Sequence, residues 1–188
     1  MRLALPVTLA ALAFAPATLR AAEPISVPAF RSIDLRGGGS IVITPGAAQR
    51  VTLVEGNSRV TRLSVDRNGR LTINACDGRC PANYKLRIEI QAPHVPDVAL
   101  TGGGAIRAAS GFRQQPRISA AISGGGRIDL RALKADAASI AVKRGGEILV
   151  HARASLSAAV VGGGAVRYWG NPKVSQVVQG GGWVGRGT

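Results

Sequence analysis

The chain has 188 residues, a formal net charge of +14, 25 glycines and only 4% aromatic residues. This length suits one domain with a sizeable core, and the abundant glycine with weak helical periodicity excludes a helical bundle and indicates an all-β protein. The positive charge predicts either an anionic partner or simply a basic, solvated surface. A nucleic-acid partner is not expected, because the basic residues are dispersed and no nucleic-acid-binding motif is present.

The N-terminus carries one positive charge ahead of an apolar run over residues 3–19, which ends in small residues. This pattern predicts a signal peptide over 1–22 that is removed on export. An uncleaved membrane anchor is the alternative, but the run is short and Pro6 and Pro16 interrupt it. We therefore expect residues 23–188 to form a single exported domain without a transmembrane span, in the periplasm or outside the cell.

Residues 25–101 have the pattern of strands and hairpins. The segments 63–65 and 71–73 flank Asn68-Gly69, a strong hairpin signal. Strict alternation over 86–90 predicts a strand with one buried and one wet face. A first glycine triplet lies at 37–39, so this half is expected to continue directly into the repeats that follow.

The second half repeats an apolar strand, a glycine triplet and another apolar strand. The triplets begin at Gly102, Gly124, Gly162 and Gly180, with a degenerate copy at Arg144, and the spacings are 22, 20, 18 and 18 residues. Aliphatic residues occupy the positions two before and two after every triplet, and serines lie five before four of them: Ser119, Ser139, Ser157 and Ser175. Such periodicity predicts a β-solenoid, in which stacked rungs bury one continuous core.

The middle glycine of each triplet is predicted to be structural, because a corner needs positive φ or close backbone approach. These glycines are Gly38, Gly103, Gly125, Gly163 and Gly181. A bulky residue there is expected to destabilise the stack. The same register places Arg127 beside Glu147 and Arg107 beside Asp129, as pairs of opposite charge on neighbouring strands.

The order of these elements resembles a known family. The segments that carry the likeness are the Gly-Gly-Gly-Ser-Ile-Val-Ile-Thr-Pro-Gly stretch near residue 40, the strands at 71–73 and 86–93, and the stretch 98–104 with the glycine-rich rungs after it. They are similar to the putative auto-transporter adhesin head GIN domain family of exported bacterial proteins. The resemblance implies a β-helical fold and an extracytoplasmic location over 23–188, and it carries no catalytic residues across.

Two small sets of residues are candidates for special roles. Cys76 and Cys80 are the only cysteines, and in an exported chain such a pair predicts a structural disulfide. Tyr168, Trp169 and Trp183 gather in the last rungs, where they either stack on a carbohydrate or cap the end of the core.

The sequence predicts no catalytic, cofactor-binding or metal-binding residues, since its acids are scattered and its histidines lie in unrelated contexts. The expected function is a non-catalytic binding or structural module of the bacterial cell envelope, with an anionic glycan or lipid as its ligand. A polysaccharide lyase or glycosidase on the same scaffold is the alternative. Self-association through an open C-terminal edge is a third.

Overall fold

The computed structural model describes residues 22–188, so the predicted signal peptide lies almost wholly outside the described residues. The described chain is built of strands and contains no helix. No membrane-spanning helix is therefore found in residues 22–188.

The first half of the described chain contributes eight strands: β1 (Glu23–Ile25), β2 (Ser32–Arg36), β3 (Ser40–Pro45), β4 (Arg50–Glu55), β5 (Arg62–Val65), β6 (Arg70–Asn74), β7 (Arg87–Ala92) and β8 (Asp97–Gly102). The second half contributes seven: β9 (Ala105–Ala108), β10 (Gln115–Gly124), β11 (Arg127–Arg144), β12 (Glu147–Gly162), β13 (Ala165–Trp169), β14 (Lys173–Gln179) and β15 (Trp183–Arg186).

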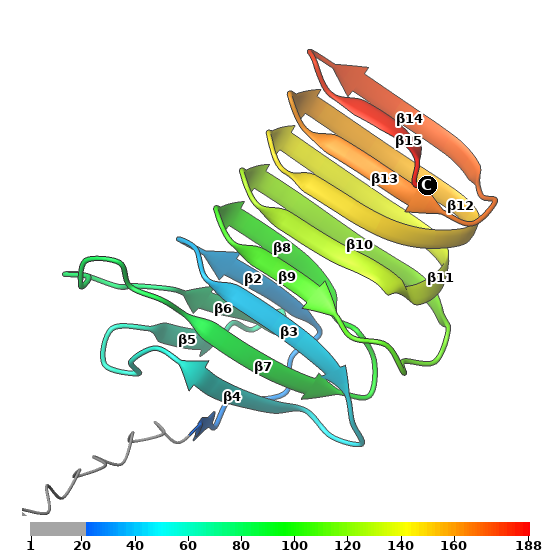
Figure 1. Ribbon diagram of the computed structural model, residues 1–188. Coiled ribbons are helices and arrows are strands. Elements are labelled where there is room, and N and C mark those ends of the chain that lie inside the picture. Colours follow the sequence, from blue (N-terminus) through cyan, green and yellow to red (C-terminus); the bar gives the residue numbers. More distant parts are fainter. Residues whose placement is uncertain (1–21) are drawn as a thin grey trace, which may run out of the picture.

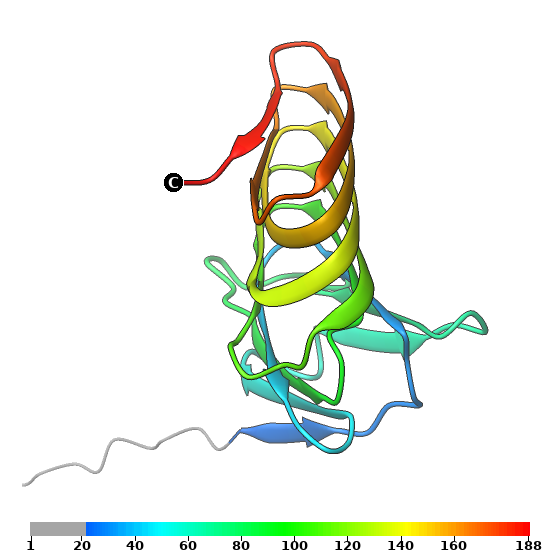
Figure 2. The same ribbon diagram turned by 90° about the vertical axis from the view of Figure 1, so that its right-hand side faces the viewer.

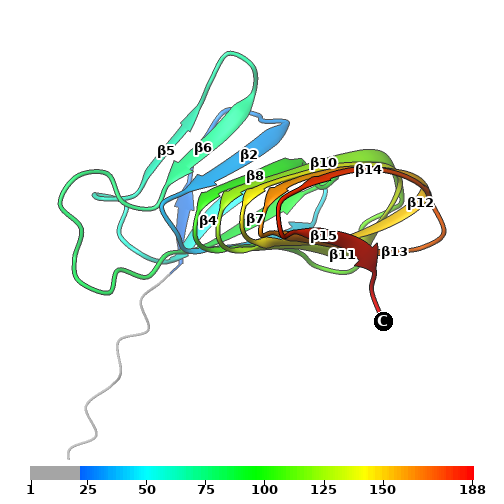
Figure 3. The same cartoon turned by 90° about the horizontal axis from the view of Figure 1, so that it is seen from above.

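These strands form one sheet that coils into a β-solenoid of about four turns (Figure 1). One side of the coil, here called face A, consists of β2, β8, β10, β14 and the later parts of β11 and β12. The other side, face B, consists of β3, β9, β13, β15 and the early parts of β11 and β12. Figures 2 and 3 show the narrow coils stacked above one another. The predicted all-β solenoid is confirmed.

The core follows from the two-residue period of the strands. Ile122, Val142 and Val160 lie side by side on face A and are almost fully buried. Ile128, Ile148 and Val166 do the same on face B. Because alternate side chains point the other way, each rung presents an aliphatic edge inward and small or charged residues outward.

The glycine triplets do form the corners between the faces, but the constrained position is not the middle one. Gly124 has φ +122°, and a Cβ there would lie 2.7 Å from the carbonyl oxygen of Gly102 on the rung below. Gly126 has φ +98°, and its Cβ would lie 2.6 Å from the carbonyl oxygen of Gly104. The outer glycines of the triplet are thus the ones that let neighbouring backbones approach.

The prediction for the middle glycines is wrong at four of its five positions. Gly103, Gly125 and Gly181 have no positive φ, and a Cβ on them would meet nothing within 4 Å. Gly163 would make only an ordinary contact, 3.6 Å from the Arg144 carbonyl oxygen. Gly38 alone adopts the left-handed region, with φ +116°. The middle residue of the corner points away from the stack, so its side chain has room.

The first half continues the same sheet. β2 pairs in parallel with β8, and β3 with β9. The predicted hairpin is confirmed: β5 and β6 are antiparallel, and Asp66 accepts hydrogen bonds from the backbone N–H groups of Asn68 and Arg70 in the turn. β7 alternates between exposed and buried side chains, as its sequence predicts.

The loop between β6 and β7 contains the disulfide between Cys76 and Cys80, which confirms that prediction. A second tie holds the same loop. The Tyr84 hydroxyl accepts a hydrogen bond from the Asn57 backbone N–H at 2.7 Å and lies 2.6 Å from the Thr61 hydroxyl. Thr61 in turn donates to the Ala75 carbonyl oxygen. The loop is therefore attached at both of its ends.

Candidate ligand-binding faces

A hollow lies on face A, across the beginnings of β10 and β14 and the later parts of β11 and β12. It has a volume of about 660 Å³. One outward column of its lining contains Arg117 on β10, Ala137 on β11, Ser155 on β12 and Lys173 on β14, which are direct neighbours in the parallel register. We call this hollow the serine groove, after its second column.

That second column consists of the four serines that the repeat period singles out: Ser119, Ser139, Ser157 and Ser175. All four are exposed and line the groove. Since neighbouring strands lie about 4.8 Å apart, the groove presents a hydroxyl at each such step. Each hydroxyl can donate one hydrogen bond and accept others.

The charge of the serine groove is purely positive. Arg117 and Lys173 are exposed, and neither forms an ion pair with a carboxylate of residues 22–188. The groove's described lining contains no aspartate or glutamate. The groove can therefore attract an anion, and its lining offers no carboxylate pair for acid–base cleavage of a glycosidic bond.

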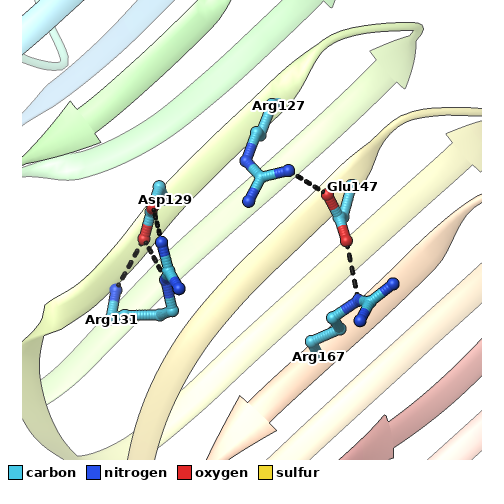
Figure 4. A network of polar contacts seen from close by, with 5 residues as sticks. All are labelled: Arg127, Asp129, Arg131, Glu147 and Arg167. Atoms are coloured by element: carbon cyan, nitrogen blue, oxygen red, sulfur yellow. Dashed lines mark hydrogen bonds and ion pairs between the residues drawn. The ribbon is translucent and has the colours of Figure 1, made fainter. Parts of the chain in front are cut away.

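Face B carries a network of opposite charges along its outer surface (Figure 4). Glu147 on β12 accepts from Arg127 on β11 at 2.5 Å and from Arg167 on β13 at 2.8 Å. The predicted pair of Arg127 and Glu147 is confirmed. The predicted pair of Arg107 and Asp129 is wrong: the two residues are neighbours in the register, but Asp129 binds Arg131 of its own strand at 2.7 Å.

The second pair is tight because Arg131 binds Asp129 three times. Its backbone N–H, Nε and one terminal nitrogen all donate to the carboxylate. Burial works to raise the pKa of Asp129, but these hydrogen bonds and the charges of Arg131 and Arg127 outweigh it and lower the pKa. The same contact raises the pKa of Arg131. Asp129 is thus held as a carboxylate by its own strand, whereas the contacts of Glu147 are the ones that join neighbouring rungs.

The three aromatic residues of the last rungs lie in two different environments. Tyr168 packs against the core, as an end cap would. Trp169 and Trp183 lie on the outer side of face B, where the guanidinium of Arg131 lies 5.2 Å from the centroid of Trp169 and that of Arg167 lies 5.1 Å from Trp183. Trp169 also borders a smaller hollow of about 310 Å³ with Arg107 and His151.

These contacts restrict what the tryptophans can do. A Cβ on Gly187 would lie 2.0 Å from the Trp169 ring, so the ring packs against the Gly187 backbone as well as lying near Arg131. Trp183 remains 41% exposed. Of the residues predicted to stack on a ligand, only Trp183 presents an open surface.

Sequence reasoning noticed the serine column but missed the two cations beside it. Arg117 and Lys173 lie seven positions before their triplets, two before the serines. The repeat register could have placed them on one outward line. That this line of residues forms a hollow has no signal in the residue pattern. No group of three or more His, Cys, Asp or Glu side chains suited to a metal ion occurs within residues 22–188.

Comparison with known proteins identifies the part of the chain that contains most of the serine groove. Residues 114–172 match the family described as putative auto-transporter adhesin, head GIN domain. The matched residues span β10 to β13. The predicted resemblance is confirmed over those residues.

Several solved structures match most of the chain, and one of them reaches a TM-score of 0.50. A putative adhesin from Bacteroides fragilis NCTC 9343 has 20% identity and a TM-score of 0.50, over 88% of this chain and 96% of that one. A putative cell adhesion protein from Clostridium sporogenes ATCC 15579 has 13% identity and a TM-score of 0.44, over 89% and 100%. A putative lipid binding protein from Parabacteroides distasonis ATCC 8503 has 16% identity and a TM-score of 0.37, over 89% and 96%. Among curated proteins no match is found.

Proposed function

We propose that the protein is an exported, non-catalytic binding module of the bacterial cell envelope whose serine groove holds an anionic glycan. One observation carries the proposal: the serine groove combines a row of exposed hydroxyls and two cations that form no ion pair within residues 22–188, and its described lining contains no carboxylate. The adhesin description of the family that matches residues 114–172 supports a binding role.

The chemistry of the groove favours a glycan over other anions. Hydroxyls that recur with every strand can exchange hydrogen bonds with sugar hydroxyls along an extended chain. The arginine and the lysine can each bind a carboxylate or phosphate substituent. The absence of acids from the described lining favours binding over the lyase or glycosidase activity that a β-solenoid could otherwise support.

Titration calorimetry with oligogalacturonate, an acidic oligosaccharide, tests the proposal, with maltooligosaccharide of equal length as the neutral control. We expect binding of the acidic chain only. Replacing Arg117 and Lys173 together by Gln should weaken it roughly tenfold, because two exposed charge contacts are lost. The matched control is Lys85→Gln with Arg87→Gln, which removes the same charge from exposed positions outside the groove and should change the affinity little.

Salt dependence gives a second check. Because exposed charges are screened over about 8–10 Å at ordinary ionic strength, affinity should fall steeply between about 0.05 and 0.5 M salt. Equal binding of the neutral chain would contradict the proposal. So would binding of anionic phosphatidylglycerol vesicles in place of the glycan, which would assign the positive surface to a membrane.

A further inference from the structure

Resting on the proposed function, we infer that the serine groove selects a glycan with two anionic groups spaced along its chain, one held by Arg117 and the other by Lys173. Both side chains point outward in one column, and three strand spacings separate them. Three spacings of about 4.8 Å place their Cα atoms about 14 Å apart. Side chains that both extend outward from the sheet keep their charges at a similar separation, which suits two anionic groups rather than one.

The residues between the two cations support a spanning ligand. Ala137 and Ser155 occupy the column between them, and neither carries a charge. Beside this column the four serine hydroxyls continue from one end of the groove to the other. The middle of the groove thus suits neutral, hydroxylated sugar atoms, and its two ends suit anions.

Two nearby acidic residues limit the positions that the ligand's anionic groups can occupy. The carboxylate of Asp97 on β8 accepts a hydrogen bond from the backbone N–H of Ser119 at 2.8 Å. Its charge repels an anion placed beyond Arg117. Asp136 next to Ala137 is occupied by Arg153 at 3.2 Å and Gln114 at 2.7 Å. The two favourable anion positions are therefore at Arg117 and Lys173.

The experiment measures affinity for oligogalacturonates from the dimer to the octamer. We expect a step in affinity at the length that first reaches both cations. For chains above the step, Arg117→Gln and Lys173→Gln should each weaken binding roughly three- to fivefold, and the losses should multiply in the double variant, because the sites are far apart. For the dimer each single variant should cost at most about twofold, since one of two equivalent ends remains.

A relocated cation gives the sharper test. Lys173→Gln combined with Ser155→Lys brings the second charge to two strand spacings, about 10 Å, from Arg117. The step should move to a shorter oligomer. Ser155 is exposed, so the change does not touch the core.

The outcomes separate the two ideas. If no oligogalacturonate binds at any length, the proposed function itself fails. If binding depends on Arg117 and Lys173 but rises smoothly with length, or the step stays in place in the relocated variant, the glycan-binding role stands and the spacing inference is overturned.

Discussion

At the residue scale, the glycine corners show that a residue's position in a repeat does not reveal which of its neighbours it touches. In the triplet of β10, Gly124 and Gly126 face the rung below and Gly125 faces solvent. We predict that Gly124→Val lowers the free energy of unfolding by roughly 1–3 kcal/mol, because valine at φ +122° is strained and its Cβ would lie 2.7 Å from the Gly102 carbonyl oxygen.

The matched control is Gly125→Val, one residue away in the same corner. It should change stability by less than about 0.5 kcal/mol, as for a surface substitution. Urea melts of the two variants measure the difference. If both variants lost roughly 1–3 kcal/mol of stability, the corner would be rigid at every position. If neither variant lost stability, the corner would tolerate a side chain at every position. Either result would contradict the prediction.

Sequence reasoning reached the spacing of these corners but not their orientation. The three residues of a triplet are all glycine, so the sequence does not distinguish them. Only the backbone conformation of the corner determines which of the three Cα atoms faces the next rung. The pair of Arg107 and Asp129 failed for a similar reason. The register is right, but Arg131 lies on the same side of its own strand, two residues on, and reaches the carboxylate first.

At the scale of elements, Glu147 joins β12 to β11 and β13, while Asp129 and Arg131 form a pair within β11. The contribution of this second pair should depend on pH. The folded state lowers the pKa of Asp129, so the unfolded chain binds the proton more readily. The stabilisation is therefore fully present above the ordinary carboxyl pKa of about 3.9 and is lost as pH falls through the folded pKa. Asp129→Asn should lower stability at pH 7 and converge with the wild type in acid.

Denaturant melts from neutral to acidic pH on both proteins provide the measurement. Arg131→Gln is the matched control, because it removes the two guanidinium contacts and leaves the carboxylate and the backbone N–H contact in place. The stability of the Arg131→Gln variant should depend less on pH in this range than the stability of the wild type does. A constant gap between wild type and Asp129→Asn at every pH would show that the asparagine acts by shape alone.

The loop between β6 and β7 is held by a disulfide and by hydrogen bonds, and we expect the disulfide to be the minor tie. Its cysteines are four residues apart, so the closed loop is short and the chain-entropy gain is about 2 kcal/mol at most. Replacing both cysteines by serine should leave the fold intact and shift the melting temperature by only a few degrees. Calorimetry on the double variant and on Tyr84→Phe compares the two ties; unfolding of the double variant at room temperature would contradict the minor role.

At the scale of the whole molecule, the two-residue and 18–22-residue periods were enough to predict the solenoid. The aliphatic columns leave only one face of each strand able to enter a core, and stacking is the one arrangement that buries all of them. The serine groove was not predicted, because its lining comes from four strands that are far apart in the sequence. A repeat therefore reveals its scaffold readily and its binding surface only after its columns are placed in space.

A stacked architecture also predicts a gradient of stability along the coil, since each rung contacts only its neighbours. The column two positions before the triplets offers a matched pair. Val142 lies between Ile122 and Val160 and is completely buried, whereas Val178 on β14 has Val160 on one side and is 39% exposed. Val142→Ala should cost roughly 2 kcal/mol through lost burial and a cavity, and Val178→Ala less than about 1 kcal/mol.

Hydrogen exchange on the unmodified protein tests the same gradient without substitution. Backbone amides of β14 and β15 should exchange by local opening of the last rung, while those of β10 and β11 should exchange only near global unfolding. Val178→Ala should speed exchange in β14 and β15 alone, and Val142→Ala should speed it throughout the coil. Uniform protection from β10 to β15, with equal costs for the two valines, would mean that the coil unfolds as one cooperative block and that the nearest-neighbour picture does not apply.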